Sequence, residues 1–130
     1  EYHYLTAHNS YLLALAEIGL PGMLLFTAVV YMATKIPVVA LGSGALEARR
    51  WGMALTATWA GLAVGIFFLS FAYHYVLWID IGLSGALYSA IKAHDPTFTV
   101  RFRWRDAIAI ACIDVVIIVA VYAYTRAMLH

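Results

Sequence analysis

The sequence HNSYLLALAEIGLPG, residues 8–22, decides how the start of the chain folds. It joins a titratable side chain, His8, to a helix-forming segment and two glycines that directly precede a long apolar run. Gly19 follows His8 by eleven residues, about three helical turns, so one helix would place both on nearly the same face. Gly22 would lie about 40° to the other side of that face. Such glycines would leave a bare strip beneath the imidazole, which another backbone or a ligand could approach closely.

Local signals around this stretch predict a short helix followed by a bend. Thr6 can cap a helix over residues 7–18, and Gly19 suits the position just after a helix end. Pro21 suits the first turn of the next helix. We therefore expect a short interfacial helix, a bend at residues 19–21 and then a membrane-spanning helix.

Composition indicates a membrane protein. The chain has 130 residues, of which 65% are hydrophobic and only 12% charged, whereas soluble domains are about half apolar and a quarter charged. Long apolar runs predict four spans, at about residues 21–41, 51–71, 76–91 and 107–122. We expect an all-α, polytopic membrane segment with four transmembrane helices and one short periplasmic interfacial helix. The first residues carry no signal-peptide pattern, so we expect a piece that starts inside a longer polytopic protein.

Three patterns within and between the spans carry further expectations. Gly61 and Gly65 form a GxxxG pattern, so we expect the second span to be buried between helices along these glycines. Pro37 is expected to kink or end the first span, and Lys35 to extend its charge toward the interface. In the third connection, arginines alternate with apolar residues over 100–105. That period fits a strand, and it fits equally a segment lying flat on lipid headgroups.

Basic residues predict the orientation of the spans. The first and third connections hold seven of the eight Lys and Arg residues: Lys35, Arg49, Arg50, Lys92, Arg101, Arg103 and Arg105. By the positive-inside rule both connections are cytoplasmic. His8, the aromatic turn at residues 73–75 and the C-terminus are then expected on the periplasmic side of a bacterial inner membrane.

The residues of the opening stretch resemble the motif of the O-antigen ligase and O-antigen polymerase superfamily. That motif is His, then Asn, Ser or Gln, nine residues, Gly, two residues, then Gly, Thr or Tyr. His8, Asn9, Gly19 and Gly22 meet every position. Residues 11–18 and 20–25, the order of the later spans and residues 77–83 also resemble the family. The resemblance covers essentially the whole chain, residues 1–130, as the C-terminal transmembrane part of such a protein.

The resemblance implies a multi-pass glycosyltransferase that is inverting and needs no metal or other cofactor. Such enzymes transfer a glycan from undecaprenyl diphosphate to an acceptor hydroxyl, on lipid A–core or on a growing polysaccharide, at the periplasmic face. It implies that His8 is catalytic and activates the acceptor. We predict that Asn9, Gly19 and Gly22 contact substrate, although Asn9 could equally satisfy backbone amides. The arginines that hold the diphosphate in the family precede the matching segment, so we expect this piece alone to be inactive.

Other classes of function stay open. Asp80 and Asp114 lie inside predicted spans, where a carboxylate costs about 3 kcal/mol, so both should face protein or water. They could carry coupling in a transporter or flippase-like bundle. A non-catalytic scaffold is a third interpretation, in which His8 is an interfacial histidine and the glycines only end and start helices. No His, Asp and Glu set has metal-ligand spacing, and the arginine-rich connection predicts contact with membrane lipid and not with nucleic acid.

Overall fold

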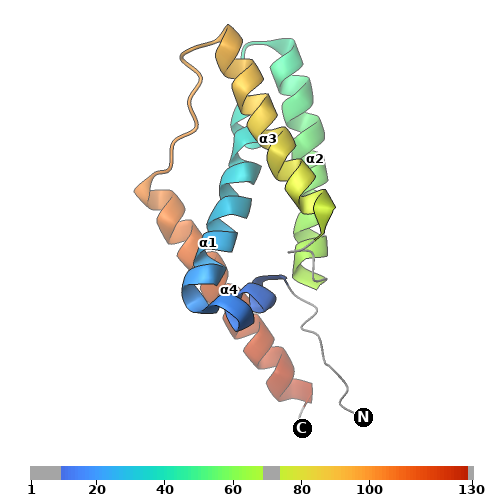
Figure 1. Cartoon of the computed structure of the whole chain (residues 1–130), viewed down its shortest axis with the longest axis vertical. Coiled ribbons are helices and arrows are strands. Elements are labelled where there is room, and N and C mark those ends of the chain that lie inside the picture. Colours follow the sequence, from blue (N-terminus) through green and yellow to red (C-terminus); the bar gives the residue numbers. More distant parts are fainter. Residues whose placement is uncertain (1–9, 69–73, 129–130) are drawn as a thin grey trace.

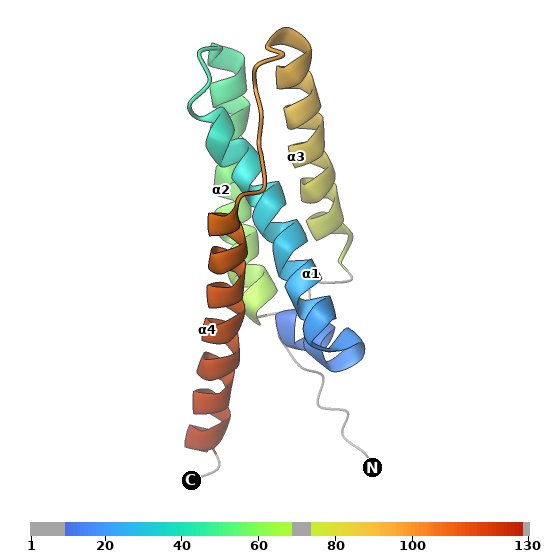
Figure 2. The same cartoon turned by 90° about the vertical axis from the view of Figure 1, so that its left-hand side faces the viewer.

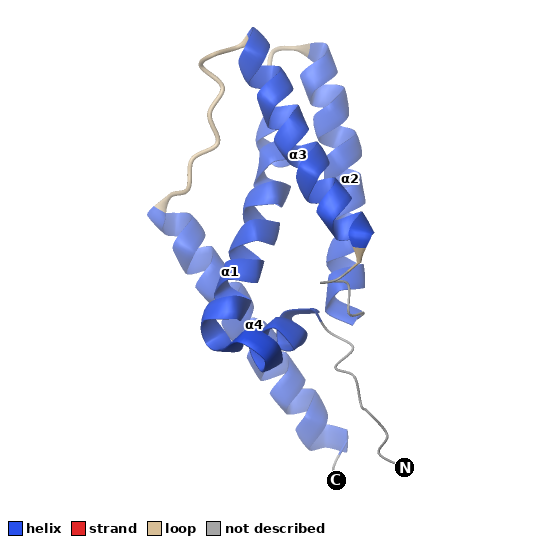
Figure 3. Ribbon diagram, in the orientation of Figure 1, coloured by secondary structure: helices blue, strands red, loops and turns tan. Residues whose placement is uncertain are grey.

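The computed structural model describes residues 10–68 and 74–128, which form four helices and their connections (Figures 1 and 3). The helices are α1 (Ser10–Ala40), α2 (Leu46–Phe68), α3 (Tyr75–His94) and α4 (Trp104–Met128). None of the described residues lies in a strand, so the predicted all-α class is confirmed. The arginine-rich connection is an extended loop rather than the strand that its alternation allowed.

α1 consists of two helical parts joined at Gly19, where the bend was predicted. Gly19 has φ +76° and ψ −171°, a backbone conformation that residues with a Cβ rarely adopt. The second part continues through Pro37 and ends at Ala40, so the helix does not end at this proline. Pro37 lies three residues before the end of the helix and is buried against α2.

α1, α2 and α3 pack around an apolar core. On α2 the buried face repeats every three or four residues, as a packed helix requires: Ala48, Gly52, Leu55, Trp59, Leu62 and Ile66. These side chains meet apolar residues of the other two helices, among them Val30, Ala33, Ala40, Leu77, Leu87 and Ile91. Inside the core the indole N–H of Trp59 donates to the Ser84 hydroxyl at 3.0 Å, which satisfies a buried polar pair.

The prediction that Gly61 lines a helix interface is wrong for the helices described. Gly61 is exposed, and a Cβ added there would meet nothing within 4 Å. Close approach occurs instead at Gly52, where an added Cβ would lie 2.9 Å from the Pro37 carbonyl oxygen. The large buried side chains of α2, such as Trp59, face α1 and α3. Gly61 therefore lies on the opposite, exposed face of the helix.

α4 is placed differently from the other helices. Among the described residues it contacts α1 and neither α2 nor α3. The extended connection descends from the end of α3, so α4 is shifted along the long axis of the molecule (Figures 1 and 2).

Three of the helices are long and apolar enough to cross a membrane: Ala14–Ala40, Tyr75–His94 and Trp104–Ala123. They correspond to three of the four predicted spans. The described part of α2, which begins with Leu46 and carries Glu47, Arg49 and Arg50 in its first turns, is not among them. The chain therefore has the character of a membrane protein, while the span at 51–71 stays a prediction.

Candidate functional site

The predicted site is divided between described and undescribed residues. His8 and Asn9 lie outside the described residues, whereas Gly19 forms the bend in α1 and Gly22 lies three residues after it. Gly22 is buried, and a Cβ added there would collide with the Ile18 side chain and lie 3.3 Å from the Ala14 carbonyl oxygen. The bend therefore brings the first part of α1 against the start of the second part.

This geometry gives both glycines of the motif a role in folding. Gly19 supplies the positive φ of the bend, and Gly22 leaves the space that Ile18 fills. The expectation of one continuous helical face carrying both is wrong, because the helix is interrupted at Gly19 itself. Their predicted contact with substrate is a separate matter and stays a prediction. Gly19 remains partly accessible, since an added Cβ would meet only the Pro21 ring, at 3.7 Å.

Tyr11, three residues after His8, holds the first part of α1 against the membrane-spanning helices. Its ring packs edge-on against Phe26, with 5.4 Å between ring centroids and 74° between the planes. It also borders an open pocket of about 420 Å³ between α2 and α4. The other residues that line this pocket are Ala63, Cys112, Ile113, Val116 and Ile117. The pocket is therefore mostly apolar and lies next to the segment that carries the motif.

Asp114 is a buried carboxylate where α4 contacts α1. The Thr27 hydroxyl donates to its Oδ1 at 2.6 Å, and only 2% of Thr27 and 3% of Asp114 are exposed. Oδ2 of Asp114 has no hydrogen-bond partner among the described residues. Asp80 is also buried, but it lies on α3, which does not contact α4 in the described part of the chain. The structure therefore buries both aspartates, as expected in a membrane, without bringing their helices together.

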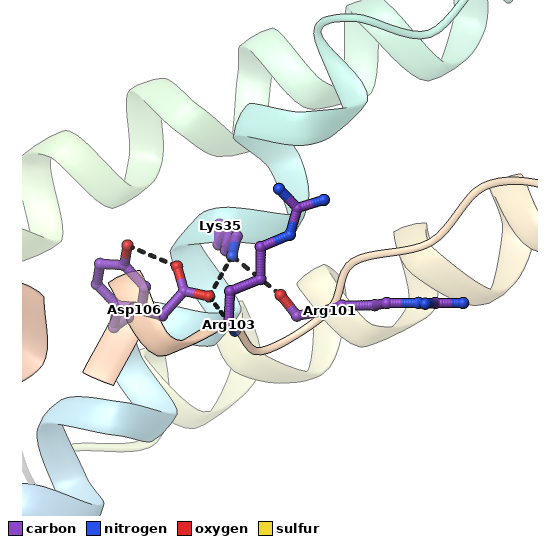
Figure 4. Close-up of polar contacts among 5 residues, drawn as sticks. Lys35, Arg101, Arg103 and Asp106 are labelled. Carbon is purple, nitrogen blue, oxygen red and sulfur yellow. Dashed lines mark hydrogen bonds and ion pairs between the residues drawn. The ribbon is translucent and has the colours of Figure 1, made fainter. Parts of the chain in front are cut away.

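A second polar junction joins α1 to the start of α4; we call it the Lys35–Asp106 junction (Figure 4). Lys35 Nζ lies 2.6 Å from Asp106 Oδ2 and donates to the Arg101 carbonyl oxygen at 3.0 Å. The Tyr31 hydroxyl donates to Asp106 Oδ1 at 3.1 Å, and the Arg103 backbone N–H donates to Oδ2 at 2.6 Å. Both oxygens of this carboxylate are therefore satisfied.

This junction was not predicted from the sequence, because the fourth span was expected to begin at about residue 107, just after Asp106. One local signal was available. An acidic side chain at the third position of a helix often accepts from the backbone N–H of the residue before the helix. Asp106 stands in that position relative to Arg103, since α4 begins at Trp104.

Comparisons of this chain with protein-family models, with curated proteins and with solved structures found no match.

Proposed function

We propose that the chain is the C-terminal membrane part of a glycosyltransferase. It would transfer a glycan from undecaprenyl diphosphate to an acceptor hydroxyl, on lipid A–core or on a growing polysaccharide, at the periplasmic face of a bacterial inner membrane. The observation that carries the proposal is the full match of His8, Asn9, Gly19 and Gly22 to the O-antigen ligase and polymerase motif.

In this proposal His8 is the general base. A sugar hydroxyl is a poor nucleophile until its proton is removed, whereas a lipid diphosphate is already a good leaving group. The neutral imidazole accepts the proton of the acceptor hydroxyl while that oxygen attacks the anomeric carbon from the side opposite the diphosphate. The glycosidic bond to the diphosphate breaks, a new one forms with inverted configuration, and Asn9 orients the imidazole or the acceptor.

Two features of α1 support this proposal. The bend at Gly19 separates a short helical part from a long apolar one, as expected where a chain leaves the membrane surface for its interior. Tyr11 packs on Phe26 and so keeps the short part close to the end of the spanning part. A lipid-linked donor presents its diphosphate at this depth, and the apolar pocket beside Tyr11 is of a kind that suits a hydrocarbon chain.

The test is His8→Ala in the intact enzyme. Loss of a general base is expected to lower glycan transfer by about 10²- to 10⁴-fold without lowering membrane expression. Glu17→Gln is the matched control, because Glu17 is exposed on the same short helical part. Normal amounts of glycan-modified product from well-expressed His8→Ala would return His8 to the role of an interfacial histidine.

The proposal requires four spans with both ends on the periplasmic side. Single cysteines at Ser43 and Thr97, in a Cys112→Ser background, should react with a membrane-impermeant thiol reagent only after the inner membrane is permeabilised. A cysteine at Thr6 should react without permeabilisation. Reaction at Ser43 from outside would move His8 to the wrong side of the membrane for this chemistry.

A transporter is the second candidate, because Asp114 is buried and one of its oxygens has no hydrogen-bond partner among the described residues. Coupled transport through the two aspartates would be abolished by Asp80→Asn or Asp114→Asn and left intact by His8→Ala. Glycosyl transfer is the better-supported function, since α3 and α4, which carry the two aspartates, make no contact within the described helices.

A further inference from the structure

The connection that leads into α4 exposes alternating basic and aromatic side chains. Arg101, Arg103 and Arg105 are all exposed. Between them Phe102 is 55% exposed and Trp104 is 78% exposed. We call residues 101–105 the arginine–aromatic segment. Its last two residues, Trp104 and Arg105, form the start of α4 and of the part of that helix that is apolar enough to cross a membrane.

Hydrogen bonds hold the backbone of this segment in place, whereas its guanidinium groups take no part in them. Lys35 binds the carbonyl oxygen of Arg101, and Asp106 accepts from the N–H of Arg103. In Figure 4 the side chains of Arg101 and Arg103 point away from the Asp106 carboxylate. None of the three guanidinium groups makes a hydrogen bond or ion pair with any residue that the structure describes.

Nearby carboxylates do not cancel this positive charge. Asp106 is paired with Lys35 at 2.6 Å. Asp95, at the far end of the connection, accepts from the hydroxyl and the backbone N–H of Thr97 and forms no ion pair with an arginine of the segment in the described structure. The segment therefore presents three positive charges and two aromatic rings on a restrained backbone.

We propose that the arginine–aromatic segment is a preformed docking surface for the headgroups of anionic phospholipids. Guanidinium groups bind phosphate oxygens in pairs, and aromatic rings favour the boundary between headgroups and hydrocarbon. Lys35 lies five residues before the end of α1 and donates to the Arg101 carbonyl oxygen. This contact places the arginine–aromatic segment near the end of a helix that is apolar enough to cross a membrane. The fixed backbone reduces the entropy lost on binding. This surface is independent of the proposed transfer reaction.

The test compares two triple variants of the full chain in a neutral detergent. Arg101→Gln, Arg103→Gln and Arg105→Gln together remove the guanidinium groups. Arg49→Gln, Arg50→Gln and Lys92→Gln remove the same charge from exposed positions elsewhere. Native mass spectrometry counts bound phosphatidylglycerol relative to phosphatidylcholine.

The first triple variant is expected to lower the preference for phosphatidylglycerol at least tenfold, since each basic residue near a membrane surface contributes about fivefold in affinity. The second is expected to lower it clearly less, because Arg50 is paired with Glu47 and Lys92 contacts the hydroxyl and ring of Tyr88, so that these groups are already engaged within the protein. Equal losses in both would overturn the proposal, because net charge would then explain the binding. So would full displacement of the lipid by inorganic phosphate, which would indicate a site for the free ion.

Folding of both triple variants is checked by helical circular dichroism. Since the guanidinium groups contact nothing in the described structure, both are expected to fold. If the first does not fold, the three single Arg→Gln variants replace it. Each is then expected to lower the preference several-fold, and three singles without effect would overturn the proposal.

Discussion

The two faces of α1 hold their neighbours by different means. Toward α2 and α3 it presents small and apolar residues, such as Val30, Ala33 and Ala40, which pack closely enough to need a glycine at position 52. Toward α4 it presents polar residues four positions apart: Thr27, Tyr31 and Lys35. Those residues bind two carboxylates of α4, Asp106 and Asp114.

The comparison shows two ways of joining helices where lipid is the solvent. Lipid tails are as apolar as Leu, so burial of apolar surface drives little association there. Close backbone packing then joins α1 to α2, whereas directed polar contacts join α1 to α4 and fix its position along the helix. The two carboxylates are not equivalent, because within the described part of the chain Asp106 has partners on both oxygens and Asp114 on one.

Gly52→Leu should give the largest effect, because it breaks the close-packed face. Its Cβ would lie 2.9 Å from a backbone carbonyl oxygen of Pro37, which cannot move aside as a flexible side chain can. We expect a loss of about 3 kcal/mol in the free energy of unfolding, at the upper end for overpacking. The measurement is the midpoint of helix loss in mixtures of mild detergent and dodecyl sulfate. Gly61→Leu is the matched control, and equal midpoints for the two variants would contradict the packing described.

Lys35→Met should give the next effect, and it acts on the polar face. It removes the cation from the Asp106 carboxylate and the hydrogen bond to the Arg101 carbonyl oxygen. We expect α4 to separate from α1 about tenfold more often, the usual scale for a lost hydrogen bond to a charged group. The readout is protease cleavage within residues 96–103. Lys92→Met, at the exposed end of α3, serves as control. No gain in cleavage over that control would show that the junction does not hold α4.

Asp114→Leu should have the smallest effect and sharpens the difference between the two carboxylates. It removes a buried oxygen that has no partner in the described structure, and the Thr27 hydroxyl can bond back to the carbonyl four residues earlier. We expect stability within about 1 kcal/mol of the unchanged chain, since an apolar side chain often replaces a poorly satisfied buried charge without loss. The measurement is again the midpoint of helix loss in mixtures of mild detergent and dodecyl sulfate. Asp106→Leu should lower this midpoint clearly more than Asp114→Leu does. If Asp114→Leu is the more damaging, then Asp114 and not Asp106 holds α4.

Much of the fold could be predicted, because local sequence patterns determine the helices and the bend. Apolar run length placed α3, predicted at 76–91 and found at Tyr75–His94, and glycine followed by proline placed the bend in α1. The packing face of α2 was not predictable from the small residues, because a GxxxG pattern does not say whether a helix lies opposite. Trp59 and its neighbours at heptad spacing face the core and determine the orientation.

The candidate site was less predictable, for two physical reasons. Contacts between residues far apart in sequence leave no local pattern, so the pairing of Lys35 with Asp106, 71 residues later, could not be read from spacing. The burial of Gly22 against Ile18 depends on the bend at Gly19, and helical arithmetic that assumes a straight helix cannot give it. His8 and Asn9, the chemical part of the motif, lie outside the described residues, so their roles stay predictions.

The sequence separation of 71 between Lys35 and Asp106 also imposes an order on biosynthesis. At about 5–20 residues per second, α1 enters the membrane several seconds before the ribosome has made Asp106. During that time the ammonium group of Lys35 must reach the lipid headgroups by itself. It thereby anchors the nascent helix before Asp106 is made. The arrival of α4 then converts this lysine from a temporary anchor to lipid into a permanent link between helices.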